Sequence, residues 1–545
     1  MGTIIAASLF TSIAIVAAWF IRPRFADSPA TMRACLFWLI SSPLLFLIYP
    51  LMGELLLCAI LLIALTPKDM DARAAFYILA LFAIPSPVQA PVPFPGINYL
   101  VVLNFPMIAC FALLAPTLAF PRAPVAARYA PVTGVLVILL TLLVAAQEFR
   151  AENLTNGLRF ALDDFILYAL PFMAILRLSQ ERAATENVIS AFLTLGLIMA
   201  CLAFISEAVD WNFYTFITER HGMAALADFR QGILRVSATV IPILVGFVAT
   251  LGLIAVDYYR DEKKGSMVMA WFYRAILAVA IIFTFARGAW LAAMVAWFTY
   301  FFFTKFPRGV RPIAIAVGLF VVVPAAIAFV LNADLGRYDP YGTFEYRREL
   351  LNASVVQFKQ HPIFGEPHYR DSGNFEHLYQ GQGIIDIVNH YVHILLKHGA
   401  VGFALYIGAF VSVILALLSL GKIVRRDDNK TLERQRAFLL AAIISYLAMI
   451  ATVSGVSVIQ ETGVFLIAVA TAFVAAARKE SMETAPATSG GDGGETPDPE
   501  AEKEEASPEF TKTAPHRPFR PGAPYSNPSA PNSGAPGDTM GDLFG

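Results

Sequence analysis

The stretch "AILAVAIIFTFARGAWLAAMVAWFTYFFFT" (residues 275–304) contains a single charged side chain, Arg287. A membrane-spanning helix needs about 20 consecutive apolar residues, so we interpret this stretch and the apolar residues before it as two spans, 268–286 and 288–304. Gly288 would permit a sharp turn between them. An arginine at membrane depth costs several kcal/mol unless it is paired or faces water, so we place Arg287 at the end of both helices.

The whole chain shows the same apolar character. It has 545 residues, of which 57% are hydrophobic and only 15% are charged, whereas soluble domains carry about 25% charged residues. We therefore predict an all-α polytopic membrane protein with about 12–15 transmembrane helices. The net charge of -1 argues against a nucleic-acid partner.

Loop charges predict the orientation and four regions. Basic residues cluster in several loops, most densely at 422–436, and the positive-inside rule places such loops in the cytoplasm. The longest hydrophilic stretch, called the island here, would then lie on the outer side. The predicted regions are N-terminal transmembrane helices at 1–331, the island as a large outer loop with short helices at 332–399, C-terminal transmembrane helices at 400–479, and a cytoplasmic tail at 480–545.

The tail is acidic and then rich in Pro and Gly. Such a composition cannot bury a core, so we predict that the tail is disordered. It would act as a tether, or alternatively as a docking segment for other assembly proteins.

Two arginines are candidate ligands for phosphate. Arg287 and Arg235 both fall at the predicted outer surface, and a guanidinium presents a fixed fork of donors that suits phosphate oxygens. Arginines from separate helices that face one cavity would suit a pyrophosphate. The alternative is that each arginine only reaches the membrane interface.

The island carries the candidate acids and bases. His390, Asp386 and Glu349 could accept a proton from a substrate hydroxyl. Arg347 and Arg348 add positive charge beside them, and we predict that they bind substrate. The alternatives are ordinary loop histidines and a solvated amphipathic helix. No recognised metal-ligand spacing is present, so we predict no metal and no cofactor. Asp163 and Asp164, near the outer end of a span, are further candidates.

Three motifs resemble those of one enzyme family, the O-antigen ligases and polymerases. "RGAWLAAMVAWF" (287–298) is similar to an Arg-containing helix start, and "YRRELLNASVVQFKQHPIFGE" (346–366) to an amphipathic helix that runs into H-P-x-x-G. "DIVNHYVHILLKHGAVG" (386–402) resembles H-N-x-Y-L followed by G-x-x-G. The resemblance covers roughly residues 235–420.

The resemblance implies a GT-C-like glycosyltransferase of the bacterial inner membrane that uses an undecaprenyl-pyrophosphate-linked glycan as donor. By the motif match, Arg287 and Arg235 would contact the pyrophosphate, and Asn389 and Tyr391 would contribute to substrate binding. Val388 stands where the family has its motif histidine. This departure puts the identity of the acid or base in doubt. It also argues against the interpretation that the protein is a ligase.

The function we expect is polymerisation of lipid-linked oligosaccharide repeat units into a surface polysaccharide or exopolysaccharide at the periplasmic face, without a metal. The partners are the lipid-linked donor, a glycan acceptor and the bilayer. One alternative is an O-antigen ligase that transfers glycan to lipid A core or to protein. A transporter of lipid-linked oligosaccharides is another, but it predicts internal repeats, and none is clear in the chain.

Overall fold

The computed structural model describes residues 2–48, 51–85, 88–95, 98–119, 124–151, 153–220, 229–230, 233–235, 237–263, 266–307, 309–311, 343–379 and 385–483. Contacts divide the chain into two units, Met1–Pro486 and Ala487–Gly545, and every described residue belongs to the first. The predicted span at 312–331 and the first part of the island lie outside the described residues. So does the tail from residue 484 onward.

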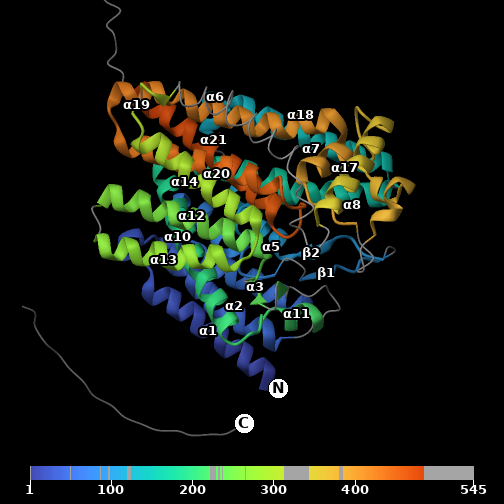
Figure 1. Cartoon of the computed structure of the whole chain (residues 1–545), viewed down its shortest axis with the longest axis horizontal. Coiled ribbons are helices and arrows are strands. Elements are labelled where there is room, and N and C mark those ends of the chain that lie inside the picture. Colours follow the sequence, from blue (N-terminus) through green and yellow to red (C-terminus); the bar gives the residue numbers. More distant parts are fainter. Residues whose placement is uncertain are drawn as a thin grey trace, which may run out of the picture. The chain divides into compact units, whose positions relative to one another are not determined.

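The N-terminal part is a series of helices with one short hairpin (Figure 1). Its elements are α1 (Gly2–Ile21), η1 (Arg24–Ala26), α2 (Pro29–Leu47), α3 (Leu51–Leu65), α4 (Met70–Leu81), β1 (Gln89–Pro91), β2 (Val102–Asn104), α5 (Phe105–Leu113), η2 (Ala115–Ala119), α6 (Val125–Tyr129), α7 (Pro131–Ala151), α8 (Leu154–Asp164), the π-helical turn η3 (Phe165–Ala169), α9 (Leu170–Leu178) and α10 (Arg182–Ala208). Strands β1 and β2 pair antiparallel, with Ala90 opposite Leu103.

The C-terminal part is also helical. It comprises α11 (Thr215–Arg220), β3 (Phe229–Arg230), β4 (Ile233–Leu234), α12 (Pro242–Lys263), α13 (Met267–Phe283), α14 (Arg287–Lys305), α17 (Thr343–Gln360), η6 (Tyr369–Asp371), η7 (Gly373–Leu378), α18 (His390–Ser419), α19 (Gly421–Asp427), α20 (Lys430–Ile450) and α21 (Ile459–Glu483). Strands β3 and β4 form a second antiparallel pair.

The predicted fold class, an all-α polytopic membrane protein, is confirmed. Among the described residues, seven helices are long and apolar enough to cross a membrane, and α3, α13 and the α5–η2 segment are shorter apolar helices. This number is below the predicted 12–15 partly because hydropathy does not locate helix ends. The predicted span 74–90, for example, stops as a helix at Leu81, and the span 98–119 starts as a strand.

Burial separates the central helices from the peripheral ones. Helices α10, α12 and α21 are almost completely buried inside the protein, whereas α1 and α7 expose most of their surface. A helix that is apolar on all sides and buried forms the interior of a membrane bundle. The exposed apolar faces of α1 and α7 suit contact with lipid.

Helix α18 is sharply bent at Gly399, which adopts φ +66°. The rings of His390 on the first arm and Tyr406 on the second are 5.6 Å apart. In a straight helix, sixteen residues would separate them by about 24 Å. A Cβ at Gly402 would overlap the His398 side chain, so the motif G-x-x-G provides both the bend and the space beside it.

The bend is held by the segment that contains "HPIFGE". Gly365 also has φ +66°, and a Cβ on it would lie 2.5 Å from the Gly399 nitrogen. Such a bend leaves helical N–H and C=O groups without partners, and three backbone hydrogen bonds replace them. These run from Ala400 N to Pro362 O (2.9 Å), from Val401 N to Ile363 O (3.1 Å) and from Glu366 N to Leu396 O (2.9 Å).

The end of α7 binds the same joint through side chains. Gln147 Nε2 donates to Phe364 O (2.7 Å) and Arg150 Nη2 donates to Gly365 O (2.9 Å). The remaining contacts are a hydrogen bond between Gln147 and His398 and an ion pair between Lys397 and Glu148 (3.2 Å). A helix that looks like an ordinary span in the sequence therefore fixes the island to α18.

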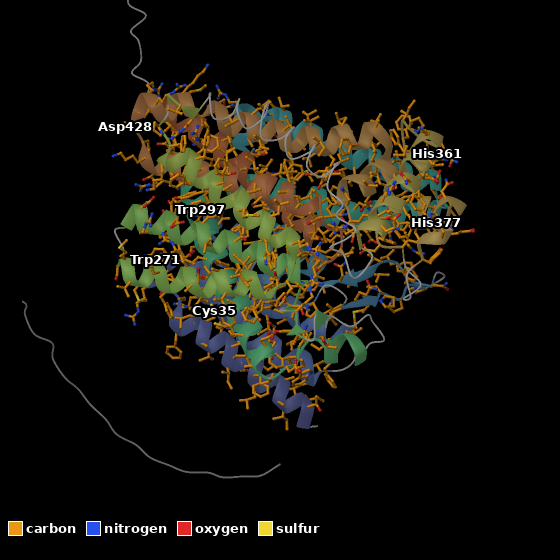
Figure 2. All side chains as sticks on the ribbon, viewed as in Figure 1. Cys35, Trp271, Trp297, His361, His377 and Asp428 are labelled. Carbon is orange, nitrogen blue, oxygen red and sulfur yellow. The ribbon has the colours of Figure 1, made fainter. Side chains whose placement is uncertain are left out.

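The island and the most basic loop lie at opposite ends of the first unit. His361 and His377 of the island are at one end, and Asp428, between α19 and α20, is at the other (Figure 2). The described part of the island has a small apolar core of its own around Tyr369, Phe375 and Ile387.

Replacing Gly399 with alanine should destabilise the protein. The new Cβ would overlap the Ile363 carbonyl, and alanine would be strained at φ +66°, so we expect a loss of roughly 2–4 kcal/mol of unfolding free energy. Thermal unfolding in detergent measures this. The matched control is Gly408→Ala in the same helix, where the nearest atom to the new Cβ is 3.6 Å away. Equal melting temperatures for the two variants would contradict the role of Gly399.

Candidate functional site

The turn between α13 and α14 positions the first arginine. Helix α13 ends at Phe283 and α14 begins at Arg287, with Phe285 at φ +46° between them. Thr284 Oγ1 donates to Ile281 O (2.7 Å) and accepts from Ala286 N (3.3 Å). The predicted turn at Arg287 is present, but Phe285 makes it. Gly288 is helical.

Arg235 reaches the same turn. Arg235 Nε donates to the carbonyl of Thr284 (3.2 Å), three residues before Arg287. Arg235 lies in a non-helical segment after β4. Arg287 is exposed and donates no hydrogen bond to any described residue, so its guanidinium donors can bind a ligand.

A second turn, Ala451 to Val458 between α20 and α21, lies directly against Gly288. A Cβ at Gly288 would overlap Thr452 Oγ1 and would lie 2.6 Å from Ile243 Cδ1. Glycine is therefore required here for the close approach of α14 to α12 and to this turn.

The same turn holds Asp386. Ser454 Oγ donates to Asp386 Oδ1 (3.0 Å). The Tyr346 hydroxyl from α17 donates to the Asp386 carbonyl (3.0 Å) and accepts from its N–H (3.1 Å). Asp386 is half-buried, so its carboxylate is partly accessible. It contacts the same turn as Gly288, the residue that follows Arg287.

His390 lies on the other side of this turn. A Cβ at Gly455 would be 2.6 Å from His390 Nδ1. The His390 side chain is fully buried, and neither ring nitrogen has a hydrogen-bond partner among the described residues. Its ring stacks on that of His393, with 5.6 Å between the ring centres, so the two histidines lie on the same face of α18.

His393 connects this region to the island. Its Nδ1 is 2.8 Å from the hydroxyl of Tyr369, which also accepts from Arg370 Nε (3.4 Å). Burial raises the pKa of Tyr369, although Arg370 opposes the shift. The phenol therefore stays protonated at neutral pH.

The other predicted residues are placed as follows. Arg347, Arg348 and Glu349 are exposed on α17, where the predicted amphipathic helix is present. The side-chain oxygen of Asn389 caps α18 by accepting from the N–H groups of residues 391 and 392. The Tyr391 hydroxyl donates to Leu447 O (2.7 Å). These two polar groups support the fold. The predicted substrate contacts of Arg347, Arg348, Asn389 and Tyr391 and the predicted catalytic role of Glu349 stay predictions.

A cavity of about 140 Å³ lies inside the bend of α18. It is bounded by both arms of α18, by α7, by α21 and by the π-helical turn η3. His390 and His398 line it together with Asp164 and Gln460. Asp163 does not line it. Within the described ranges, no group of three or more His, Cys, Asp or Glu side chains could hold a metal ion.

Sequence reasoning missed the turn that joins these parts. Thr452, Ser454 and Gly455 lie in "TVSGVSVIQ" (452–460), which separates two predicted spans. The small and polar residues of this stretch indicate a turn. Only the packing shows that Gly288, Asp386 and His390 converge on it.

Gly288→Ala should couple energetically to Thr452. We expect the single variant to lose about 1–3 kcal/mol of stability from overpacking, and Thr452→Ala to change it little. In the double variant, removal of the Thr452 hydroxyl should restore part of the loss, because neighbouring residues are non-additive. Unfolding temperatures of the four proteins complete this cycle. Strict additivity would show that the two residues are not in contact.

Comparison with known proteins bears on this region. Residues 272–407 match the family model described as O-antigen ligase. No curated protein matches the chain. The matched segment is about a quarter of the chain, and it contains the turn with Arg287, the island and the bend of α18. The matched family implies a membrane enzyme of ligase or polymerase type. The resemblance in the motifs is confirmed for residues 272–407, which are similar to the O-antigen ligase family.

Proposed function

We propose that this protein is a polysaccharide polymerase that joins oligosaccharide repeat units carried on undecaprenyl pyrophosphate. The observation that supports this most is the turn at residues 451–458. It contacts Gly288 beside Arg287, it holds Asp386, and it packs on His390. The residue after a candidate cationic group and a candidate base thus contact one short segment.

The arginines would bind the donor. Arg287 is exposed, and Arg235 lies at the same turn. Guanidinium groups bind phosphate oxygens through paired, charge-assisted hydrogen bonds. They also stabilise the negative charge that develops on a departing pyrophosphate, so the reaction needs no metal ion.

Asp386 is the base in this proposal. The acceptor hydroxyl oxygen forms a bond to the anomeric carbon of the donor sugar, and the bond from that carbon to the pyrophosphate oxygen breaks. The hydroxyl proton passes to the Asp386 carboxylate, and the lipid pyrophosphate leaves as an anion beside the arginines. Among the described residues, Ser454 donates to Oδ1 and none donates to Oδ2, so Oδ2 is the oxygen that takes the proton in this proposal. Glu349 is exposed on α17, and no hydrogen bond with another described residue fixes its carboxylate.

A ligase would use the same donor chemistry and differ only in the acceptor. Val388, at the position of the family's motif histidine, is half-buried and apolar. Because this residue cannot transfer a proton, the sequence favours the polymerase. A ladder of glycan lengths would indicate the polymerase, whereas a single product on lipid A core or on protein would indicate the ligase.

Arg287→Ala should lower turnover about 100- to 1000-fold, the usual cost of losing one donor to a developing anion. The assay supplies purified protein with its lipid-linked repeat unit and measures release of the lipid pyrophosphate. Arg425→Ala, in the exposed basic helix α19, is the matched control and should retain wild-type turnover. Full activity in Arg287→Ala would overturn the clamp. A loss of turnover on adding a chelator would overturn the metal-free mechanism.

Asp386→Asn should lower kcat by about 100- to 10,000-fold, because the amide keeps the shape but cannot accept the proton. Binding of the donor should persist. Asp371→Asn is the control, because Asp371 is an exposed carboxylate of the same island. Wild-type kcat in Asp386→Asn, with reduced kcat in Glu349→Gln or His390→Gln, would transfer the role of base to that residue.

A further inference from the structure

The cavity inside the bend of α18 has an unusual buried polar group. His390 lines it, is fully buried, and has two ring nitrogens without a partner among the described residues. Burying a polar group without a hydrogen bond destabilises the folded state, and such groups in folded proteins call for an explanation. A bound molecule that supplies one acceptor and one donor would provide it.

The opposite wall adds further polar groups. The π-helical turn Phe165–Ala169 follows Asp164, and both Asp164 and Tyr168 line the cavity. Such π-helical turns inside α-helices are frequent at functional sites. The Tyr168 hydroxyl donates to Gln460 Oε1, so Gln460 presents its amide Nε2 as a donor. Asp164 accepts no hydrogen bond from the described residues.

The described lining of the cavity does not suit the phosphate part of a substrate. Lys397 lines the cavity but is paired with Glu148 at 3.2 Å. No unpaired cation remains among the described lining residues. An anionic ligand belongs with Arg287 instead, on the other side of the 451–458 turn.

The volume of the cavity corresponds to one ring. A cavity of about 140 Å³ is close to the ~150 Å³ that accommodates a benzene ring in a protein interior. Aromatic side chains of Tyr406, Phe410 and Tyr446 form part of the wall. A hydrocarbon chain would fit the volume but would leave His390 and Asp164 unpaired.

We propose that this cavity binds a single neutral sugar ring, with His390, Asp164 and Gln460 as partners for its hydroxyl groups and the aromatic side chains against its faces. This inference rests on the proposed function, in which the ring belongs to the acceptor glycan. His390 then has the role of a positioning residue for the acceptor, and Asp386, across Ser454 and Gly455, remains the base.

The test measures binding without any lipid-linked donor, so it is independent of turnover. Full-length protein in nanodiscs is mixed with methyl pyranosides of glucose, galactose, mannose and N-acetylglucosamine, and saturation-transfer NMR detects bound sugar. We expect a signal for at least one of these sugars with wild-type protein. His390→Phe should weaken its binding by roughly tenfold or more, because the substitution keeps a ring and removes both nitrogens.

Two further variants separate binding from folding. Ala409 lines the cavity and is buried, so Ala409→Leu should fill it and abolish the signal. Ala404 is exposed on the same arm, and Ala404→Leu should retain wild-type binding. Unfolding temperatures should show that His390→Phe is at least as stable as wild type, since an unpaired buried polar group has been removed.

The outcomes distinguish the two proposals. No sugar signal in wild type, or an equal signal in wild type, His390→Phe and Ala409→Leu, overturns the sugar site whatever the enzyme does. A sugar signal that the two cavity variants lose supports the site even if Arg287→Ala retains turnover, a result that would overturn only the clamp.

Discussion

The contact between the backbones of Gly365 and Gly399 is the constraint on which the candidate site depends. A helix that bends within an apolar surrounding leaves N–H and C=O groups without water to bind them, at a cost of several kcal/mol each. Here the "HPIFGE" segment supplies those partners, and the two glycines allow the backbones to approach. The bend in turn brings His390 to Tyr406 and creates the cavity.

The turn at residues 451–458 divides the chemistry into two environments. On one side, Arg287 is exposed and Arg235 lies half-buried at the same turn. On the other, a neutral histidine, a carboxylate and an amide face a small cavity with aromatic walls. Asp386 is hydrogen-bonded to Ser454 of this turn. This separation suits a reaction in which an anionic leaving group and a neutral acceptor meet at one carbon.

Hydropathy located most helices but not their interruptions. The turn at Arg287 and the helix that begins near Tyr346 were predictable, because a lone charge and an amphipathic pattern have local causes. The bend at Gly399 and the π-helical turn after Asp164 were not, since both depend on contacts with segments far away in the chain. Gly288 was assigned to a turn, whereas its absent side chain serves the packing of α14 against Thr452.

The sequence by itself determined the membrane class, the position of the island and the identity of the arginine and aspartate candidates, because these follow from composition, loop charge and motifs within single segments. Only the tertiary structure decided which candidates lie near one another. It brought Arg235 to the turn that precedes Arg287 and Asp386 to Ser454, and it enclosed His390 without a partner among the described residues. The reason is physical: proximity between segments tens or hundreds of residues apart arises from side-chain packing and backbone hydrogen bonding, which no local pattern records.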